Sequence, residues 1–270
     1  MQRRAHWPDA WLVWLGAIIL IAWVLLALGG SVLSLPAICT AGAVPLSASL
    51  DLALISGSPF KFALSWGLMV VAMMLPLAVA PLWHLRVRTF ARRRGRSTLA
   101  FIAGFIAIWM AAGIVLQTVA LLLRWVVSPP IASAGLAIAA ALVWQISPAK
   151  QWFLNRCHQR PPLAAFGLAA DRDAFLFGLK NGAACAGACW ALMLPMLLIA
   201  DGRFVAMIAT TLFILAESLE SPARLAWRWR GGAKVLRVLA AWRPARARYF
   251  APLTKSRISR VRRSSAVLIE

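Results

Sequence analysis

Six long apolar stretches dominate this sequence and restrict the folds that are open to it. They cover about residues 10–30, 61–83, 98–123, 131–149, 174–200 and 204–223. A bilayer hydrocarbon core of about 30 Å needs roughly 20 helical residues to cross it. Within lipid a helix bonds all its own backbone groups, and the alternation typical of barrel strands is missing here. We therefore predict an all-α fold, a polytopic transmembrane bundle of about six helices.

The positions of Lys and Arg predict how this bundle is oriented. The 29 basic residues gather in the N-terminal arm, in 84–97, in 150–173 and from Arg224 onward; the exceptions are Arg124, Arg203, Lys61 and Lys180. Short loops rich in Lys and Arg stay on the cytoplasmic side of a membrane. We therefore expect both termini to be cytoplasmic, in a protein integral to the plasma membrane, which in a bacterium is the inner membrane.

This arrangement divides the chain into a transmembrane domain, 1–223, and a basic cytoplasmic tail, 224–270. The tail carries Trp227 and Trp229 among its arginines, a pattern typical of a helix lying at the membrane interface, and from Lys255 onward its composition favours disorder. The net charge of +21 is explained by anionic lipids at the basic face rather than by nucleic acid.

Two thiols and a thioether share one stripe of the fifth apolar stretch. Cys185, Cys189 and Met193 follow one another at intervals of four residues, which places them on one face of a helix. Soft sulfur ligands suit Cu⁺ best and Zn²⁺ second. The competing interpretation is packing, because buried Cys behaves as a small hydrophobe and Met fills gaps. Cys39, in the connection 31–60, has no expected partner, so all four cysteines are read as thiols.

Four polar residues fall within the last two apolar stretches and need partners inside the bundle. Lys180 and Asn181 precede the thiols, and Glu217 and Glu220 lie three residues apart in the sixth stretch. If these two helices pack back to back, the carboxylates reach the depth of Lys180. Either a packing ion pair or a functional role, such as accepting protons from the thiols, fits this arrangement.

Two further elements add candidate sulfur ligands. Met73 lies with Met69 on one face of the second stretch, three residues before Pro76, which is expected to kink that helix. Cys157 and His158 stand side by side at a membrane edge, where they could receive a metal from the cytoplasm. For both elements the alternative is structural: ordinary core packing for the methionine and an inert thiol for the cysteine.

Taken in order, these motifs resemble a known family. Ala72-Met73-Met74-x-Pro76, then Gln145-x-Ser147-Pro148-x-Lys150 leading to Cys157, then Cys185-x-Gly187-x-Cys189-Trp190 are similar to the family of predicted metal-binding integral membrane proteins, a domain of unknown function sometimes labelled copper chaperone. The resemblance covers about residues 60–222. It implies a polytopic helical membrane protein whose cysteines bind a metal, and the expected metal is copper.

The chain departs from the family pattern at two thiol positions. The family has a cysteine four residues before the one matching Cys157, where this chain has Phe153, and another directly before the one matching Cys189, where this chain has Ala188. The resemblance therefore implies a metal site of Cys157, Cys185 and Cys189, with Met193 or Met73 as a further ligand. A divergent member that kept the fold and lost the metal is the alternative.

Three functions remain open. The first is metal handling, in which the protein binds, delivers or transports Cu⁺ received from a metal-donor protein. The second is a non-catalytic structural or assembly subunit of a larger membrane complex. The third is transport of another solute past Lys180, Asn181 and Glu217. Hydrolase, kinase and dinucleotide-binding signatures are missing from the sequence, so we do not expect an enzyme.

Overall fold

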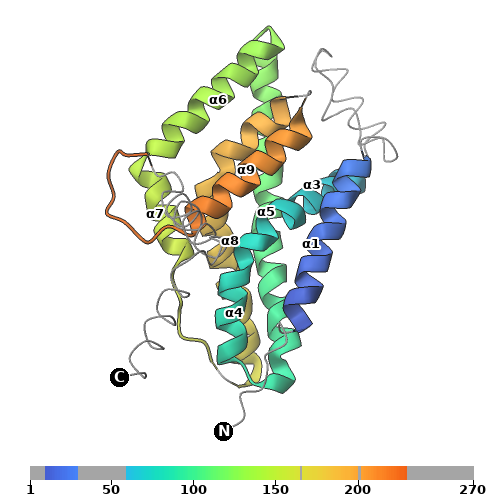
Figure 1. Ribbon diagram of the computed structural model, residues 1–270, viewed down its shortest axis with the longest axis vertical. Coiled ribbons are helices and arrows are strands. Elements are labelled where there is room, and N and C mark those ends of the chain that lie inside the picture. Colours follow the sequence, from blue (N-terminus) through green and yellow to red (C-terminus); the bar gives the residue numbers. More distant parts are fainter. Residues whose placement is uncertain (1–9, 30–58, 165, 200–201, 230–270) are drawn as a thin grey trace, which may run out of the picture. The chain divides into compact units, whose positions relative to one another are not determined.

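The computed structural model describes residues 10–29, 59–164, 166–199 and 202–229, and these segments contain helices and no strand. Figure 1 shows their arrangement. The α-helices are α1 (Ala10–Gly29), α3 (Pro59–Met74), α4 (Val79–Arg88), α5 (Arg94–Val126), α6 (Pro130–Ile146), α7 (Pro148–Cys157), α8 (Gly167–Leu198) and α9 (Arg203–Ser218). Two short 3-10 turns, η2 (Leu75–Ala78) and η3 (Ala91–Arg93), join neighbouring helices. The all-helical prediction is confirmed.

Four helical segments are long and apolar enough to cross a membrane, namely Ala10–Leu28, Ala63–Arg88, Ala91–Val126 and Gly167–Leu198. A fifth span arises if the bent pair Ile131–Ile146 and Pro148–Cys157 is counted as one. The sixth predicted span is shorter than expected, because α9 ends at Ser218 after 16 residues. At 1.5 Å per residue that is about 24 Å, short of the hydrocarbon core.

Helix α8 is the centre of the packing and lies most extensively against α5. Glycines make this contact close: a Cβ on Gly178 would collide with the backbone of Phe101, and one on Gly104 with the backbone of Phe175. At Gly182 a Cβ would stand 3.0 Å from the carbonyl oxygen of Phe105. Gly178 and Gly182, four residues apart, therefore form a small-residue helix-packing surface on α8.

The kink predicted at Pro76 is also present. The 3-10 turn η2 interrupts the path from α3 to α4 there, because proline has no N–H to continue the helical bonding. Met73, Met74, Leu75 and Ala78 around it are buried.

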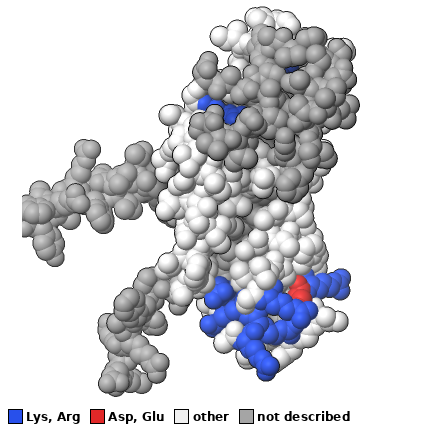
Figure 2. All heavy atoms as spheres, turned by 90° about the vertical axis from the view of Figure 1, so that its right-hand side faces the viewer, with Lys and Arg blue, Asp and Glu red and all other residues white. Residues whose placement is uncertain are grey.

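Basic side chains gather at one end of the molecule, as Figure 2 shows. The connection from α4 to α5 supplies Arg88, Arg92, Arg93, Arg94 and Arg96. Asp171, near the start of α8, forms ion pairs with two of these arginines. Its Oδ2 lies 3.0 Å from Arg93 Nη2 and 2.9 Å from Arg96 Nη2.

Candidate functional site

A sharp break between α6 and α7 shapes the site. The predicted helix over 131–149 ends at Ile146, and α7 starts at an angle of 67° to α6. Ser147 is extended (φ −71°, ψ 146°), the conformation that a following proline favours, and its hydroxyl accepts a hydrogen bond of 3.2 Å from the backbone N–H of Lys150. This N-cap turns the polar face of α7 into the protein.

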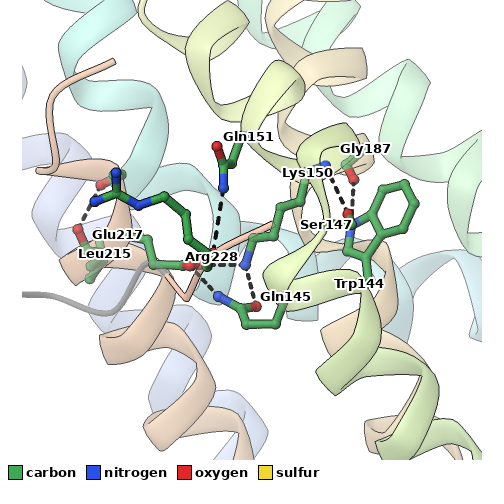
Figure 3. A network of polar contacts seen from close by, with 10 residues as sticks. Trp144, Gln145, Ser147, Lys150, Gln151, Gly187, Leu215, Glu217 and Arg228 are labelled. Atoms are coloured by element: carbon green, nitrogen blue, oxygen red, sulfur yellow. Dashed lines mark hydrogen bonds and ion pairs between the residues drawn. The ribbon is translucent and has the colours of Figure 1, made fainter. Parts of the chain in front are cut away.

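Lys150 is thereby buried beside Glu217 of α9. Lys150 Nζ lies 2.7 Å from Glu217 Oε2, and both side chains are 2% exposed. The amide of Gln145 bridges the pair, donating to the carboxylate and accepting from the ammonium group (Figure 3). We call these three residues the buried triad. The sequence left open an ion pair between Lys180 and Glu217 or Glu220; in the structure Glu217 pairs with Lys150, which the bend at Ser147 brings beside it.

The segment after α9 runs extended along the same face of α7. Asn155 donates to the carbonyl of Ala223 (2.8 Å) and accepts from its N–H (3.1 Å), and Gln151 binds Ala226 in the same reciprocal way (2.6 and 3.1 Å). The N–H of Arg228 reaches the carbonyl of Ile146 at 3.1 Å. We call this non-helical segment, residues 219–229, the strap. It contains Trp227 and Trp229, so the interfacial helix predicted for the tail does not include them; residues 230–270 lie outside the described segments.

Three free thiols from two helices line one cavity of about 720 Å³. Cys157 comes from the C-terminal end of α7, and Cys185 and Cys189 come from successive turns of α8. We call this the thiol cavity. Pro76, from the kink at η2, and Ile214 and Ser218, from α9, complete its walls. The three cysteines that the family resemblance implies as a metal site thus line one cavity, and their joint binding of a metal remains a prediction.

Within the cavity the α8 thiols are direct neighbours. Cys185 and Cys189 are 5% and 3% exposed and lie one helical turn apart on the same stripe of α8. Cys157 is half-buried and close enough to interact electrostatically with both. The fully buried indole N–H of Trp109, which has no hydrogen-bond partner among the described residues, lies beside Cys185.

The other predicted ligands are placed differently. Met73 and Met193 are buried in the hydrophobic core, 0% and 1% exposed, and neither lines the thiol cavity. His158 lines it, but both ring nitrogens lie near backbone oxygens, Leu154 O at 2.9 Å and Ser218 O at 3.1 Å. In the described segments no three His, Cys, Asp or Glu side chains are grouped so as to hold a metal ion.

Phe153, at the position where the resembling family has a cysteine, packs directly on Gly187. Its ring occupies the space that a Cβ on Gly187 would fill, on the face of α8 opposite to Cys185 and Cys189. Trp144 adds a hydrogen bond from Nε1 to the Gly187 carbonyl at 3.2 Å. The segment that leads to Cys157 and the Cys185-x-Gly187-x-Cys189 motif, which are linked in the sequence only by the family resemblance, are therefore in contact.

The remaining polar candidates lie at the edge of this region. Lys180 is exposed and lines a second cavity, whereas Asn181 is buried and lines both cavities. Glu220 is half-buried, and its backbone N–H donates to the carbonyl of Glu217 at 3.0 Å.

Helix packing and cavity together define an all-helical protein, compatible with a membrane location, in which three thiols line one cavity. The chain belongs to the family described as PpoB2, copper chaperone, whose model matches residues 63–242. The matched segment contains the buried triad and all three thiols. No curated protein and no solved structure matches the chain.

Proposed function

We propose that this protein binds Cu⁺ through Cys185 and Cys189, with Cys157 as a third thiol, and hands the ion on within a membrane. The observation that carries the proposal is the thiol cavity, which cysteines from both α7 and α8 line. The family description, copper chaperone, supports the choice of metal and names a carrier rather than a reaction. Copper is the cargo in this proposal and not a resident cofactor.

The chemistry of the donors fits a soft ion. Thiolates select Cu⁺ over hard cations, and binding replaces the thiol protons with the metal. The unpartnered N–H of Trp109 beside Cys185 suits this exchange, since it can donate to a thiolate sulfur once the proton has left. Cu⁺ is stable with two thiolates, so Cys185 and Cys189 suffice for a first site and Cys157 closes it. Met73 and Met193 remain predicted ligands only.

A location in the plasma membrane with cytoplasmic termini is part of the same proposal. Four long apolar helices and one bent pair support it, as does the basic end in Figure 2, which suits anionic lipid headgroups on the cytoplasmic side.

The test is elemental analysis of the detergent-purified protein after loading with Cu⁺ under reducing conditions. Wild type is compared with Cys185→Ser/Cys189→Ser and with a Cys39→Ser control. We expect about one copper per chain in wild type and control, and none in the double variant, with helix content unchanged in all three. Wild-type protein that holds no copper would refute the proposal.

A structural subunit of a larger membrane complex is the second candidate. Phe153 favours it, because an aromatic ring stands where the family has a thiol. This function predicts that Cys185→Ser is without effect and that the protein co-purifies with other subunits.

A further inference from the structure

A second cavity, of about 660 Å³, lies between α7, the residues that follow it and α8. Arg156, Arg160 and Lys180 line it, and none of its lining residues is acidic. We call it the basic cavity. Trp152, Phe153 and Phe177 supply an apolar wall, so the space combines positive charge with aromatic surface.

The three cations carry charge that the described residues do not neutralise. Lys150, Arg93 and Arg96 each lie within 3.0 Å of a carboxylate oxygen. The basic cavity differs: the Arg156 guanidinium stacks 3.7 Å from the Trp152 ring centroid. Arg160 Nη1 donates to the backbone oxygens of Cys157 and Gln159, each at 3.0 Å, and no described carboxylate pairs with any of the three cations. Neutral partners position these groups and leave their charge available to an anion.

The basic cavity adjoins the thiol cavity. Arg160 and Asn181 line both. Asn181 is 7% exposed, so its side-chain amide is a buried polar group at the boundary of the two cavities. An anion bound here would accept hydrogen bonds from the Arg160 guanidinium and from the Asn181 amide N–H groups, where the two cavities adjoin.

We propose that the basic cavity is the docking site of the copper donor, and that this donor is a small anionic thiolate complex of Cu⁺ bearing carboxylate groups. The inference rests on the proposed function. Two thiolates around one Cu⁺ leave a net negative charge, and carboxylates on the thiol add to it. Arg156, Arg160 and Lys180 hold these groups, the aromatic wall covers the organic part, and Asn181 lies where the complex meets Cys157.

Transfer from the docked complex is a ligand exchange without redox change. The Cys157 sulfur forms a bond to Cu⁺ while one donor sulfur–copper bond breaks, and the proton of Cys157 leaves with the released donor thiolate. Copper remains in the +1 state. Cys185 and Cys189 then replace Cys157 and the remaining donor sulfur by the same step.

The experiment compares two copper sources on the full-length protein. One is Cu⁺–glutathione, which carries carboxylates, and the other is the cationic acetonitrile complex of Cu⁺. The variant is Arg156→Gln/Arg160→Gln/Lys180→Gln. The matched control, Arg88→Gln/Arg92→Gln/Arg94→Gln, removes the same charge from the basic end. We expect the variant to load at least about tenfold more slowly from glutathione, as steering by charge predicts, with unchanged rate from acetonitrile and unchanged final copper.

Equal loading rates from glutathione in variant and wild type would overturn docking while leaving the proposed function intact. A wild type that loads from neither source would refute both. A third outcome is that the basic cavity binds a phospholipid, and mass spectrometry of the lipid that co-purifies with the protein detects it. If an anionic phospholipid co-purifies with wild type, is lost from the variant and blocks loading when added back, the basic cavity is a lipid site and the inference is wrong.

Discussion

The buried triad and the thiol cavity share helices α7 and α9, yet their polar groups differ in whether they have hydrogen-bond partners. In the triad, Lys150, Gln145 and Glu217 satisfy one another. Beside the thiols, the buried Trp109 N–H has no hydrogen-bond partner among the described residues. A buried polar group without a partner costs free energy, so it is retained where a ligand can supply the partner. The triad fixes architecture, and the thiol cavity is left ready for a ligand.

The strongest way to break this comparison is to remove one member of the triad. Glu217→Leu leaves the Lys150 ammonium buried without its counter-charge, and we expect a loss of about 3–5 kcal/mol in unfolding free energy. Unfolding in mixed micelles titrated with dodecyl sulfate measures it. Glu220→Leu, at a half-buried position, serves as control. If both variants are equally stable, the triad is not a structural element.

The double variant Lys150→Met/Glu217→Leu sharpens the same point. It removes both charges and fills the space with apolar groups, so it should recover most of the stability lost in Glu217→Leu. Its copper content should equal that of wild type. A double variant as unstable as the single one would mean that the triad contributes more than mutual charge satisfaction.

A smaller effect is expected where the strap meets α7. Asn155→Ala removes two hydrogen bonds to Ala223 and leaves that backbone unsatisfied, at a cost of about 1–3 kcal/mol. Limited proteolysis within 219–229, together with unfolding free energy, reports the change. Gln159→Ala, at an exposed neighbouring position, should leave both unchanged. Copper lost from Asn155→Ala would contradict the separation of scaffold from site.

Several of these features follow from the sequence, and others do not. The close helix contact at Gly178 and the break in the helix at Pro76 were predictable, because glycine and proline act through local backbone chemistry. The partner of Glu217 was not, since Lys150 looks like one more basic residue of a cytoplasmic loop. The signal that could have corrected this is Ser147-Pro148, an N-cap followed by proline, which starts a new helix. The strap has no periodicity, so only its contacts reveal it.

The smallest expected effect concerns two indole N–H groups, one available to a ligand and one that forms a hydrogen bond within the fold. Trp109→Phe removes an N–H that has no partner among the described residues, so stability should be unchanged while Cu⁺ affinity falls about threefold, within the range of one hydrogen bond. Trp66→Phe is the matched control, because its N–H donates to the Trp109 carbonyl at 2.7 Å. That variant should lose about 1 kcal/mol of stability and keep its copper affinity. The reverse pattern would show that the Trp109 N–H serves packing, and the contrast between triad and cavity would no longer hold.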